Sequence, residues 1–367
     1  FYPLIENPYS EKDIKEGIKV LKSRQLTISK KTKNYEKYFT KKFNSKYSVM
    51  VNSGSSANLL ALQCLINPYR KNRLKRGDEV IIPTLCWSTS LWPIIQSGLK
   101  PIFVDIDQNT LNIDENEIVK KISKKTKAIM LVHVLGNSCD MDKILKIKRK
   151  YNLYLIEDCA QSHGSKYKKK LTGSFGEFGC FSFYPTKNLG AIGDGGFICT
   201  NNKKLYEKAR QIREYGWNKN RIANVVGRNS RLDEIQASIL DAKLKFLKKD
   251  TIKRQLIAKL YKKEIKCKDV KHPLVNTHQN HAFHLYVVKV KKRNDLIKYL
   301  KKKNIFCGIH YPHPIHLQPG YKNKIIIKHK LKITERVSKE ILSLPIYPEL
   351  SLNKVKQISR LINNFYN

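Results

Sequence analysis

Lys187 has different surroundings from the many other lysines of the chain. Phe181, Phe183 and Tyr184 precede it, and a glycine-rich turn at 193–196 follows it. An amine in apolar surroundings loses hydration, so its pKa falls below the ordinary value of about 10.4. Its neutral form then becomes available as a nucleophile or a base. The sequence therefore predicts that Lys187 is held inside the protein as a reactive amine.

Asp158 follows an apolar run at 153–156 that is expected to be a strand. It would lie at the carboxyl end of that strand, where open α/β sheets bind their ligands. An isolated aspartate at such a point is also a common N-cap of the next helix, and Asp158 taken alone fits that structural role better. The sequence leaves both roles open.

The segment N-S-G-S-S-A-N at 52–58 lies between a predicted strand and a predicted helix. Gly54 permits a close approach of the backbone, and Ser55 and Ser56 add hydroxyl groups at a helix N-terminus, which favours anions. Serine and asparagine are also ordinary helix caps, so the segment alone is weak support for a phosphate site.

Together, a reactive lysine, a carboxylate at a strand end and a phosphate cradle match the requirements of pyridoxal phosphate. Its aldehyde needs an amine, its pyridine nitrogen needs an anion, and its phosphate needs hydrogen-bond donors. Trp87, in the loop after the predicted strand at 79–82, is a candidate to stack on the ring. A core position for Trp87 is equally compatible with the sequence.

Short apolar runs alternate with amphipathic stretches between residues 45 and 200, which is typical of a parallel α/β sheet covered on both faces. Seven runs are expected to be strands: 47–51, 79–82, 101–104, 128–132, 153–156, 180–183 and 197–200. After about residue 250 the pattern changes to a strand at 282–290, a helix at 296–302 and a last helix at 333–342. We therefore expect a large domain at 1–248 and a smaller α+β domain at 249–367.

The composition is that of a folded protein with a strongly basic surface. The 367 residues are 41% hydrophobic, which excludes a disordered chain, and 72 Lys and Arg against 30 Asp and Glu give a net charge of +42. This charge would suit a nucleic acid, but the lysines are spread along the whole chain, so a nucleic-acid partner is not expected. The eight cysteines are isolated from one another in the sequence, as is usual for reduced thiols. The sequence also shows no apolar membrane span and no secretory signal. Together these features favour a cytoplasmic protein.

Several motifs resemble the DegT/DnrJ/StrS-type nucleotide-sugar aminotransferases over nearly the whole chain. The string S-F-Y-P-T-K-N-L-G-A-I-G-D-G-G is highly specific, and E-D-C-A-Q-S-H-G and G-R-N-S-R-L-D-E-I-Q-A add to it. The resemblance implies the aspartate-aminotransferase type of PLP-dependent transferase fold, an α/β fold with a mostly parallel seven-stranded sheet in the large domain. It also implies a homodimer with shared active sites.

The same resemblance implies a role for each residue of the site. Lys187 would form the Schiff base with pyridoxal phosphate, which passes through pyridoxamine phosphate during turnover. The cofactor would also contact Asp158 through its ring nitrogen, Gln161 through its phenolic oxygen and Trp87 through its ring face. The phosphate would be held by Gly54, Ser55, Ser56 and Ser182, and by Asn229 of the neighbouring subunit. His310 and Tyr184 are expected to contact the substrate.

The first half of the chain is also similar to the 4-keto-6-deoxysugar 3-dehydratases, which use pyridoxamine phosphate and carry His where this chain has Lys187. At these two positions this chain has Lys187 and Gln161, the residue types that the aminotransferases carry. The motifs I-H-Y-P-H-P-I-H-L-Q-P-G-Y and I-L-S-L-P-I-Y-P-E-L resemble enzymes that make 3-amino-3,6-dideoxyhexoses on thymidine diphosphate. The implied reaction is transamination of such a ketosugar with glutamate, in the biosynthesis of aminosugars for a surface polysaccharide such as O-antigen lipopolysaccharide.

Three histidines near the C-terminus raise the question of a metal. His310, His313 and His316 are separated by Pro312 and Pro314, which break any helix that would align them, and no acidic residue accompanies them. We therefore expect a loop that contacts the substrate and no metal. The remaining alternatives are a dehydratase and a non-catalytic regulator that binds nucleic acid.

Overall fold

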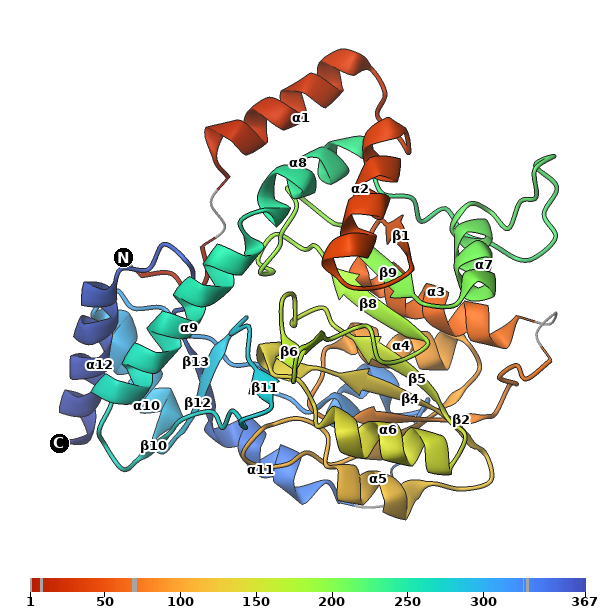
Figure 1. Cartoon of the computed structure of the whole chain (residues 1–367). Coiled ribbons are helices and arrows are strands. Elements are labelled where there is room, and N and C mark those ends of the chain that lie inside the picture. The colour runs from red at the N-terminus through yellow and green to blue at the C-terminus, as the bar shows by residue number, and fades with distance from the viewer. Residues whose placement is uncertain (1, 7–8, 68–70, 326, 328–329) are drawn as a thin grey trace.

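A seven-stranded sheet forms the centre of the protein (Figure 1). The structure is a computed structural model that describes residues 2–6, 9–67, 71–325, 327 and 330–367. The sheet has the order β1-β9-β8-β5-β4-β2-β3. Its strands are β1 (Tyr47–Val51), β2 (Glu79–Pro83), β3 (Lys100–Val104), β4 (Thr126–Val132), β5 (Tyr154–Asp158), β8 (Phe178–Ser182) and β9 (Gly196–Thr200). Each strand overlaps one of the seven predicted runs, so the predicted fold class is confirmed.

The sheet is mostly parallel. β3, β2, β4, β5 and β8 pair in parallel, whereas β9 pairs antiparallel with both β8 and β1. The carboxyl ends of the five parallel strands therefore meet at one edge, where residues that follow different strands can share a site.

Helices cover both faces of the sheet, as the alternation of side chains along the strands requires. One face is packed by α3 (Gly54–Ile66), α4 (Ser88–Gln96) and α7 (Lys203–Arg213). The other face is packed by α5 (Glu115–Lys121) and α6 (Met141–Lys150), and near β8 and β9 by α2 (Lys30–Lys42) and α8 (Glu234–Leu244). α1 (Glu11–Ser23) lies outside them against α8.

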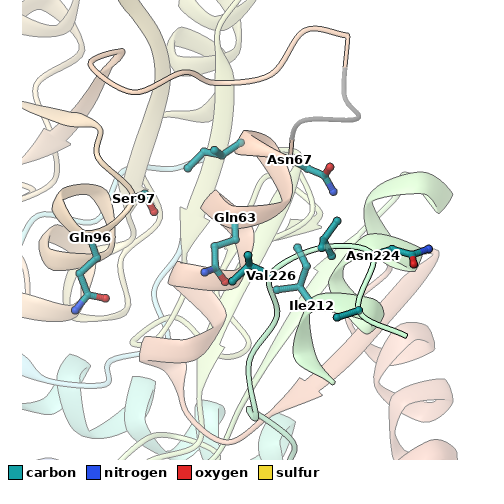
Figure 2. Close-up of a pocket in the computed structure, with 10 residues that line it drawn as sticks. Gln63, Asn67, Gln96, Ser97, Ile212, Asn224 and Val226 are labelled. Atoms are coloured by element: carbon teal, nitrogen blue, oxygen red, sulfur yellow. The ribbon is translucent and has the colours of Figure 1, made fainter. Parts of the chain in front are cut away.

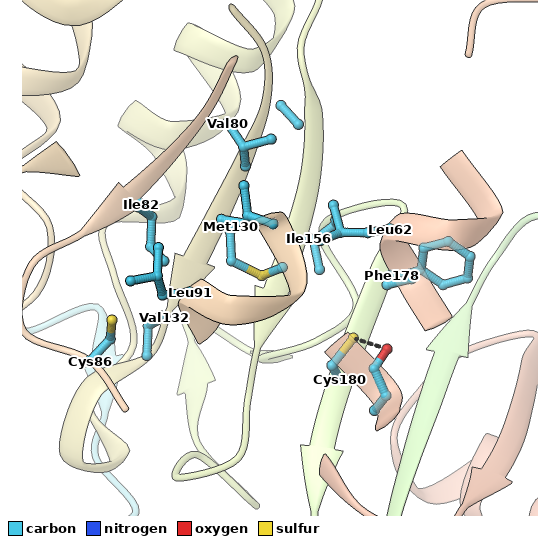
Figure 3. Packing of buried hydrophobic residues seen from close by; sticks show 14 of the residues in the cluster. Leu62, Val80, Ile82, Cys86, Leu91, Met130, Val132, Ile156, Phe178 and Cys180 are labelled. Atoms are coloured by element: carbon cyan, nitrogen blue, oxygen red, sulfur yellow. Dashed lines mark hydrogen bonds between the residues drawn. The ribbon is translucent and has the colours of Figure 1, made fainter. Parts of the chain in front are cut away.

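The core under α3 fixes the position of that helix (Figure 3). Leu62 of α3 belongs to the same buried cluster as Val80, Met130 and Ile156 of the sheet. Cys180 adds a hydrogen bond from its thiol to the carbonyl of an α3 residue, Ala57, at 3.5 Å. α3 is buried on most of its circumference, so its N-terminus is held firmly at the carboxyl edge of the sheet.

A second lobe is built on a three-stranded antiparallel sheet of the order β10-β12-β13. Its elements are β10 (Val270–Lys271), β12 (Tyr286–Val290), β13 (Ile341–Leu344), α9 (Leu247–Glu264), α10 (Arg293–Lys302), α11 (Lys332–Glu340) and α12 (Leu352–Tyr366). A third, small sheet joins β11 (Gln279–Asn280), β6 (Lys166–Tyr167) and β7 (Lys170–Leu171), and the short 3-10 helices are η1 (Val134–Gly136), η2 (Ile315–Leu317) and η3 (Pro319–Tyr321). The expected domain boundary at 248 falls in the first turn of α9 and remains a prediction.

Two expectations for this lobe are corrected. The helix expected at 333–342 ends at Glu340, because the next four residues are all buried and pair with β12 as β13. It is not the last helix, since α12 follows. The strand expected at 282–290 begins only at Tyr286, because Ala282 and Leu285 instead donate backbone hydrogen bonds to Gly136 and Leu135. Such local contacts decide strand ends that an apolar run leaves open.

Among the described residues, no helix has the length and apolar character that crossing a membrane requires. None of the eight cysteines, all of which the structure describes, forms a disulfide; six are buried and two are partly buried. This agrees with the prediction that they form no disulfide framework.

Candidate active site

A cavity of about 450 Å³ lies at the carboxyl edge of the large sheet. It is formed by the ends of β5 and β8, the first turns of α3 and α4, and two segments of the second lobe near residues 284 and 310. Nine of the eleven predicted site residues line it: Lys187, Asp158, Gln161, Gly54, Ser55, Trp87, Ser182, Tyr184 and His310. The fold thus brings together residues that are up to 256 positions apart, from Gly54 to His310.

Asp158 is the last residue of β5 and is 4% exposed. Its Oδ2 accepts hydrogen bonds from Asn58 Nδ2 at 2.8 Å and from Ser90 Oγ at 2.7 Å. Its Oδ1 accepts the backbone N–H of Ala160 at 3.0 Å. Asp158 caps no helix, because turns and the strand β6 follow it, so the N-cap alternative is wrong. The residue stabilises the following turn and presents a fixed carboxylate to the cavity.

Lys187 reaches the cavity from the loop after β8. Burial lowers the pKa of its amine to about 8, and the carboxylate of Asp158 partly opposes this shift. Lys187 is half-buried and not fully enclosed, and its lowered pKa agrees with the predicted loss of hydration. At pH 7 an amine with this pKa is neutral in about a tenth of the molecules.

The first turn of α3 makes a tight contact with the end of β8. A Cβ atom at Gly54 would lie 2.5 Å from Cβ of Ser182, so no side chain fits there. Ser53 caps the helix by accepting the backbone N–H of Ser56 at 3.1 Å. Ser55 lines the cavity, whereas Ser56 does not. Within the described chain the backbone N–H groups of Gly54 and Ser55 have no partner, and Gly54 lies beside the hydroxyl of Ser182, which suits a phosphate.

Gln161 is clamped in the cavity wall. Its Oε1 accepts the backbone N–H of Leu135 at 2.6 Å, and its Nε2 donates to the phenol oxygen of Tyr311 at 2.6 Å. The ring of Tyr311 lies 5.5 Å from that of Trp87. Trp87 is 58% exposed, so it belongs to the cavity wall and not to the core.

Four further residues belong to this site and were not predicted from the sequence. Asn58 and Ser90 hold Asp158, Tyr311 holds Gln161, and His284 lines the cavity. Asn58 and Tyr311 stood inside motifs that were already singled out. Ser90 ends the segment R-L-K-R-G-D-E-V-I-I-P-T-L-C-W-S-T-S, which resembles the dehydratases, and His284 lies in the strand predicted at 282–290. Only the folded chain shows that both residues reach the cavity.

Asn229 lies outside the cavity and is exposed. It forms an isolated backbone bridge with Glu214, at the base of the segment that leaves α7 and projects from the body of the protein (Figure 1). Its predicted contact with a neighbouring subunit remains a prediction.

The histidines expected to form no metal site have separate partners. His310 Nδ1 lies 2.8 Å from Ser343 Oγ, and His316 Nε2 lies 3.3 Å from Glu335, while His313 is exposed. In the described chain the single group with metal-ligand spacing is the buried set of His133, Glu157 and Cys159.

The carboxylate of that buried set is already engaged. Glu157 lies 3.0 Å from His133 Nε2 and accepts the backbone N–H groups of Gly173, Phe175 and Gly176 at 2.7–2.8 Å. His133 Nδ1 accepts a backbone N–H as well. These bonds fix the loop that follows β7 and account for the set as a structural network.

Another hollow of about 600 Å³ lies between the ends of α3, α4 and α7 (Figure 2). Gln63, Asn67, Gln96 and Asn224 face it together with Ile212 and Val226. None of its ten lining residues carries a titratable side chain. It therefore offers no group for acid–base or covalent chemistry, and the cavity around Lys187 is the candidate active site.

Comparisons with known proteins agree with this geometry. Residues 8–363 match the model of the DegT/DnrJ/EryC1/StrS aminotransferase family. The dTDP-3-amino-3,6-dideoxy-alpha-D-galactopyranose transaminase of Aneurinibacillus thermoaerophilus is 40% identical over 356 residues, which cover 97% of this chain and 96% of that protein.

Solved structures are also similar along the whole chain, and two of them illustrate this similarity. The S. venezuelae protein DesV, in complex with a ketimine intermediate, has a TM-score of 0.93 and 28% identity, covering 100% of this chain and 99% of that one. The E. coli GDP-4-keto-6-deoxy-D-mannose-3-dehydratase with bound hydrated PLP has a TM-score of 0.92 and 28% identity, covering 99% of both chains. The sequence match over residues 8–363 establishes that the chain belongs to the DegT/DnrJ/EryC1/StrS aminotransferase family.

Proposed function

We propose that the protein is a PLP-dependent aminotransferase that transfers an amino group from glutamate to a nucleotide-linked keto-6-deoxysugar. The observation that carries this proposal is the shared cavity of Lys187, Asp158 and the N-terminus of α3. An amine with a lowered pKa, a fixed carboxylate and a set of phosphate donors are the three groups that pyridoxal phosphate needs.

The residues of the cavity fit this cofactor. The contact between Gly54 and Ser182 leaves backbone N–H groups and hydroxyls for its phosphate, with Ser55 on the cavity side. Asp158 would hold the ring nitrogen, Gln161 the phenolic oxygen, and Trp87 the ring face. When bound, the cofactor supplies an aldehyde and an electron-withdrawing ring that makes the α-carbon of an amino acid acidic.

The chain supplies the proton transfers. In the first half-reaction the neutral Nζ of Lys187 accepts the proton of the donor's α-carbon. In the second half-reaction the same atom delivers a proton to the sugar carbon that receives the amine. Asp158 keeps its position throughout, because Asn58 and Ser90 hold it from the side.

For the substrate we propose a thymidine diphosphate sugar aminated at C3. The relative from Aneurinibacillus thermoaerophilus carries this chemistry in its name, and it is 40% identical along nearly the whole chain. The dehydratase among the similar structures is named for a GDP sugar, so a guanosine diphosphate substrate is the alternative. His310 and Tyr184, which line the cavity, are our candidates for the sugar contacts.

We further propose a homodimer in which Asn229 completes the phosphate site of the neighbouring subunit. The exposure of Asn229 at the base of the segment after α7 supports this role, since the residue does not line the cavity of its own chain. The free cysteines suit a reducing cytoplasm, where aminosugars for O-antigen and other surface polysaccharides are made.

The test is a panel of dTDP-, GDP- and UDP-linked ketosugars, each incubated with the enzyme and glutamate. We expect conversion of the dTDP-linked 3-keto-6-deoxysugar to an aminosugar, identified by mass and NMR. A dehydratase would instead consume a 4-ketosugar with loss of water and no stoichiometric incorporation of nitrogen. The Lys187→Ala variant is the control, and borohydride reduction followed by mass spectrometry should attach a pyridoxyl group to Lys187 in the native enzyme alone. Absence of any aminosugar product across the panel would refute the proposal.

A further inference from the structure

The side chain of Asn188 joins the loop of Lys187 to the second lobe. Its Nδ2 donates a hydrogen bond of 2.9 Å to the backbone carbonyl of Ala282, 94 positions further along the chain. Its Oδ1 is buried and has no partner among the described residues, so this bond is the one attachment of the amide. Lys187 lines the cavity, whereas Asn188 does not. Asn188 therefore acts on the cavity through its neighbour Lys187.

The loop is otherwise held at its base and by one buried side chain. Ala191 donates a backbone hydrogen bond of 2.8 Å to the carbonyl of Phe183, which closes the loop. Leu189 is 1% exposed and packs into the buried cluster of α2, β8 and β9. In the described part of the chain, the bond from Asn188 is the one hydrogen bond between residues 184–190 and the second lobe.

The acceptor carbonyl is itself fixed. Ala282 is buried, and its N–H donates to the carbonyl of Gly136 at 2.9 Å. Next to it, the buried guanidinium of Arg254 donates to the carbonyls of Phe283 at 3.2 Å and Ile346 at 2.9 Å. The segment is thus bonded on two sides, so the carbonyl of Ala282 is a rigid point to which the loop is attached.

The same segment also holds Gln161. The backbone N–H of Leu285 donates to the carbonyl of Leu135 at 3.3 Å, and the N–H of Leu135 donates to Oε1 of Gln161 at 2.6 Å. A set of hydrogen bonds therefore runs from the loop of Lys187, through residues 282–285, to the side-chain amide of Gln161. The aldehyde and the phenolic oxygen of pyridoxal phosphate are on adjacent ring carbons. An amine that reacts with the aldehyde must therefore stay in register with the amide that, on the proposed function, contacts the phenolic oxygen.

We propose that Asn188 is a positioning residue that ties the Lys187 loop to the second lobe and so sets the amine at the carbon with which it reacts. The inference deepens the proposed function and rests on its cofactor chemistry. Lysine has a long side chain with many rotamers, so the position of Nζ depends on where the backbone at residue 187 is held. A hydrogen bond from the next residue fixes that backbone, which lowers the cost of bringing the amine and the aldehyde together.

Two variants remove the donor. Asn188→Leu has a similar size and no polar group, and Asn188→Ala is a second variant in case leucine does not pack. The matched control is Tyr9→Phe, which removes a different hydrogen bond of the same loop, that of 2.7 Å from the Tyr9 hydroxyl to the carbonyl of Ala191. Neither Asn188 nor Tyr9 lines the cavity. The comparison therefore separates the bond to Ala282 from the general stability of the loop.

The experiment uses the full-length chain freed of cofactor and needs neither glutamate nor a sugar. The affinity for pyridoxamine phosphate, which has no aldehyde, measures how well the cavity binds the cofactor without a covalent bond. The rate at which pyridoxal phosphate becomes attached to Lys187 is measured by borohydride reduction at a series of times and mass spectrometry of the peptides.

We expect this rate, at saturating cofactor, to fall about tenfold in both Asn188 variants, while their affinity for pyridoxamine phosphate stays unchanged. Tyr9→Phe should change neither quantity. Native folding of each variant is checked by circular dichroism.

An unchanged attachment rate in a folded Asn188 variant would overturn the inference. So would an equal slowing in Tyr9→Phe or an equal loss of affinity for pyridoxamine phosphate, because either result would make the bond a general support of the loop and not a contact that places the amine. No attachment to Lys187 in the native chain would refute the covalent role of this lysine and the inference with it. Absence of an aminosugar from the panel of ketosugars would refute the proposed reaction and leave the measured positioning of Lys187 as it stands.

Discussion

The side-chain amide of Gln161 donates a hydrogen bond of 2.6 Å to the phenol oxygen of Tyr311, 150 positions further along the chain. Gln161 follows β5 of the large sheet, whereas Tyr311 belongs to the second lobe. The bond therefore joins the two parts of the cavity wall. It also orients the side-chain amide of Gln161, which we propose contacts the phenolic oxygen of the cofactor.

Substitution Tyr311→Phe tests this link. It leaves Nε2 of Gln161 without its acceptor in a buried place, and the loss of one such bond is worth about tenfold in kcat/KM. Steady-state kinetics with glutamate and the ketosugar measure the effect. Tyr299→Phe in α10 is the control, since its ring packs on Phe365 far from the cavity. Equal kinetics for Tyr311→Phe and the native enzyme would show that the amide needs no such support.

The pH dependence of proton transfer follows from the pKa of Lys187. Burial disfavours the ammonium form, so the amine loses its proton near pH 8 instead of near its ordinary value of 10.5. Only the neutral amine accepts a proton. The rate of exchange of the α-proton of glutamate should therefore rise about tenfold per pH unit below pH 8 and level off above it. Deuterium exchange followed by NMR measures this rate, and a rise that continues to pH 10 would contradict the lowered pKa.

Gly54 should tolerate no side chain. In Gly54→Ala the new methyl group would lie 2.5 Å from Cβ of Ser182, so α3 and β8 must move apart. We expect a loss of about 1–3 kcal/mol in the free energy of unfolding and a weaker affinity for pyridoxal phosphate. Urea denaturation and cofactor titration measure the two effects. Gly320→Ala is the matched control, because no atom lies within 4 Å of its Cβ position. Similar cofactor affinity in both variants would argue against a phosphate site at this turn.

A shared active site predicts complementation between inactive variants. Lys187→Ala and Asn229→Ala each damage every site of their own homodimer, but a mixed dimer contains one intact site. Random mixing in equal amounts should restore about a quarter of the native activity. The activity of the mixture after subunit exchange is the measurement. If exchange is verified by mass spectrometry and no activity returns, each chain builds its own site.

Local patterns were sufficient for much of the fold. The seven apolar runs of the large sheet each became a strand, because buried parallel strands are marked by short apolar segments that amphipathic helices separate. The sequence patterns predicted the elements of the second lobe less accurately. The run after Glu340 has the same apolar character in a helix or a strand, and pairing with β12 decided for the strand.

For the site, too, the sequence predicted some residues, and the tertiary structure was needed for the others. Residue types and motifs identified Lys187, Asp158 and the turn at Gly54, since an amine among aromatic residues and a carboxylate after a strand are local features. Which side chains hold them depends on distance in space. Asn58 and Ser90 reach Asp158 from two helices, and Tyr311 reaches Gln161 from the other lobe. The periodicity of the sequence does not predict these side-chain contacts. They form only when the parallel strands bring their carboxyl ends to a common edge and the second lobe packs over that edge.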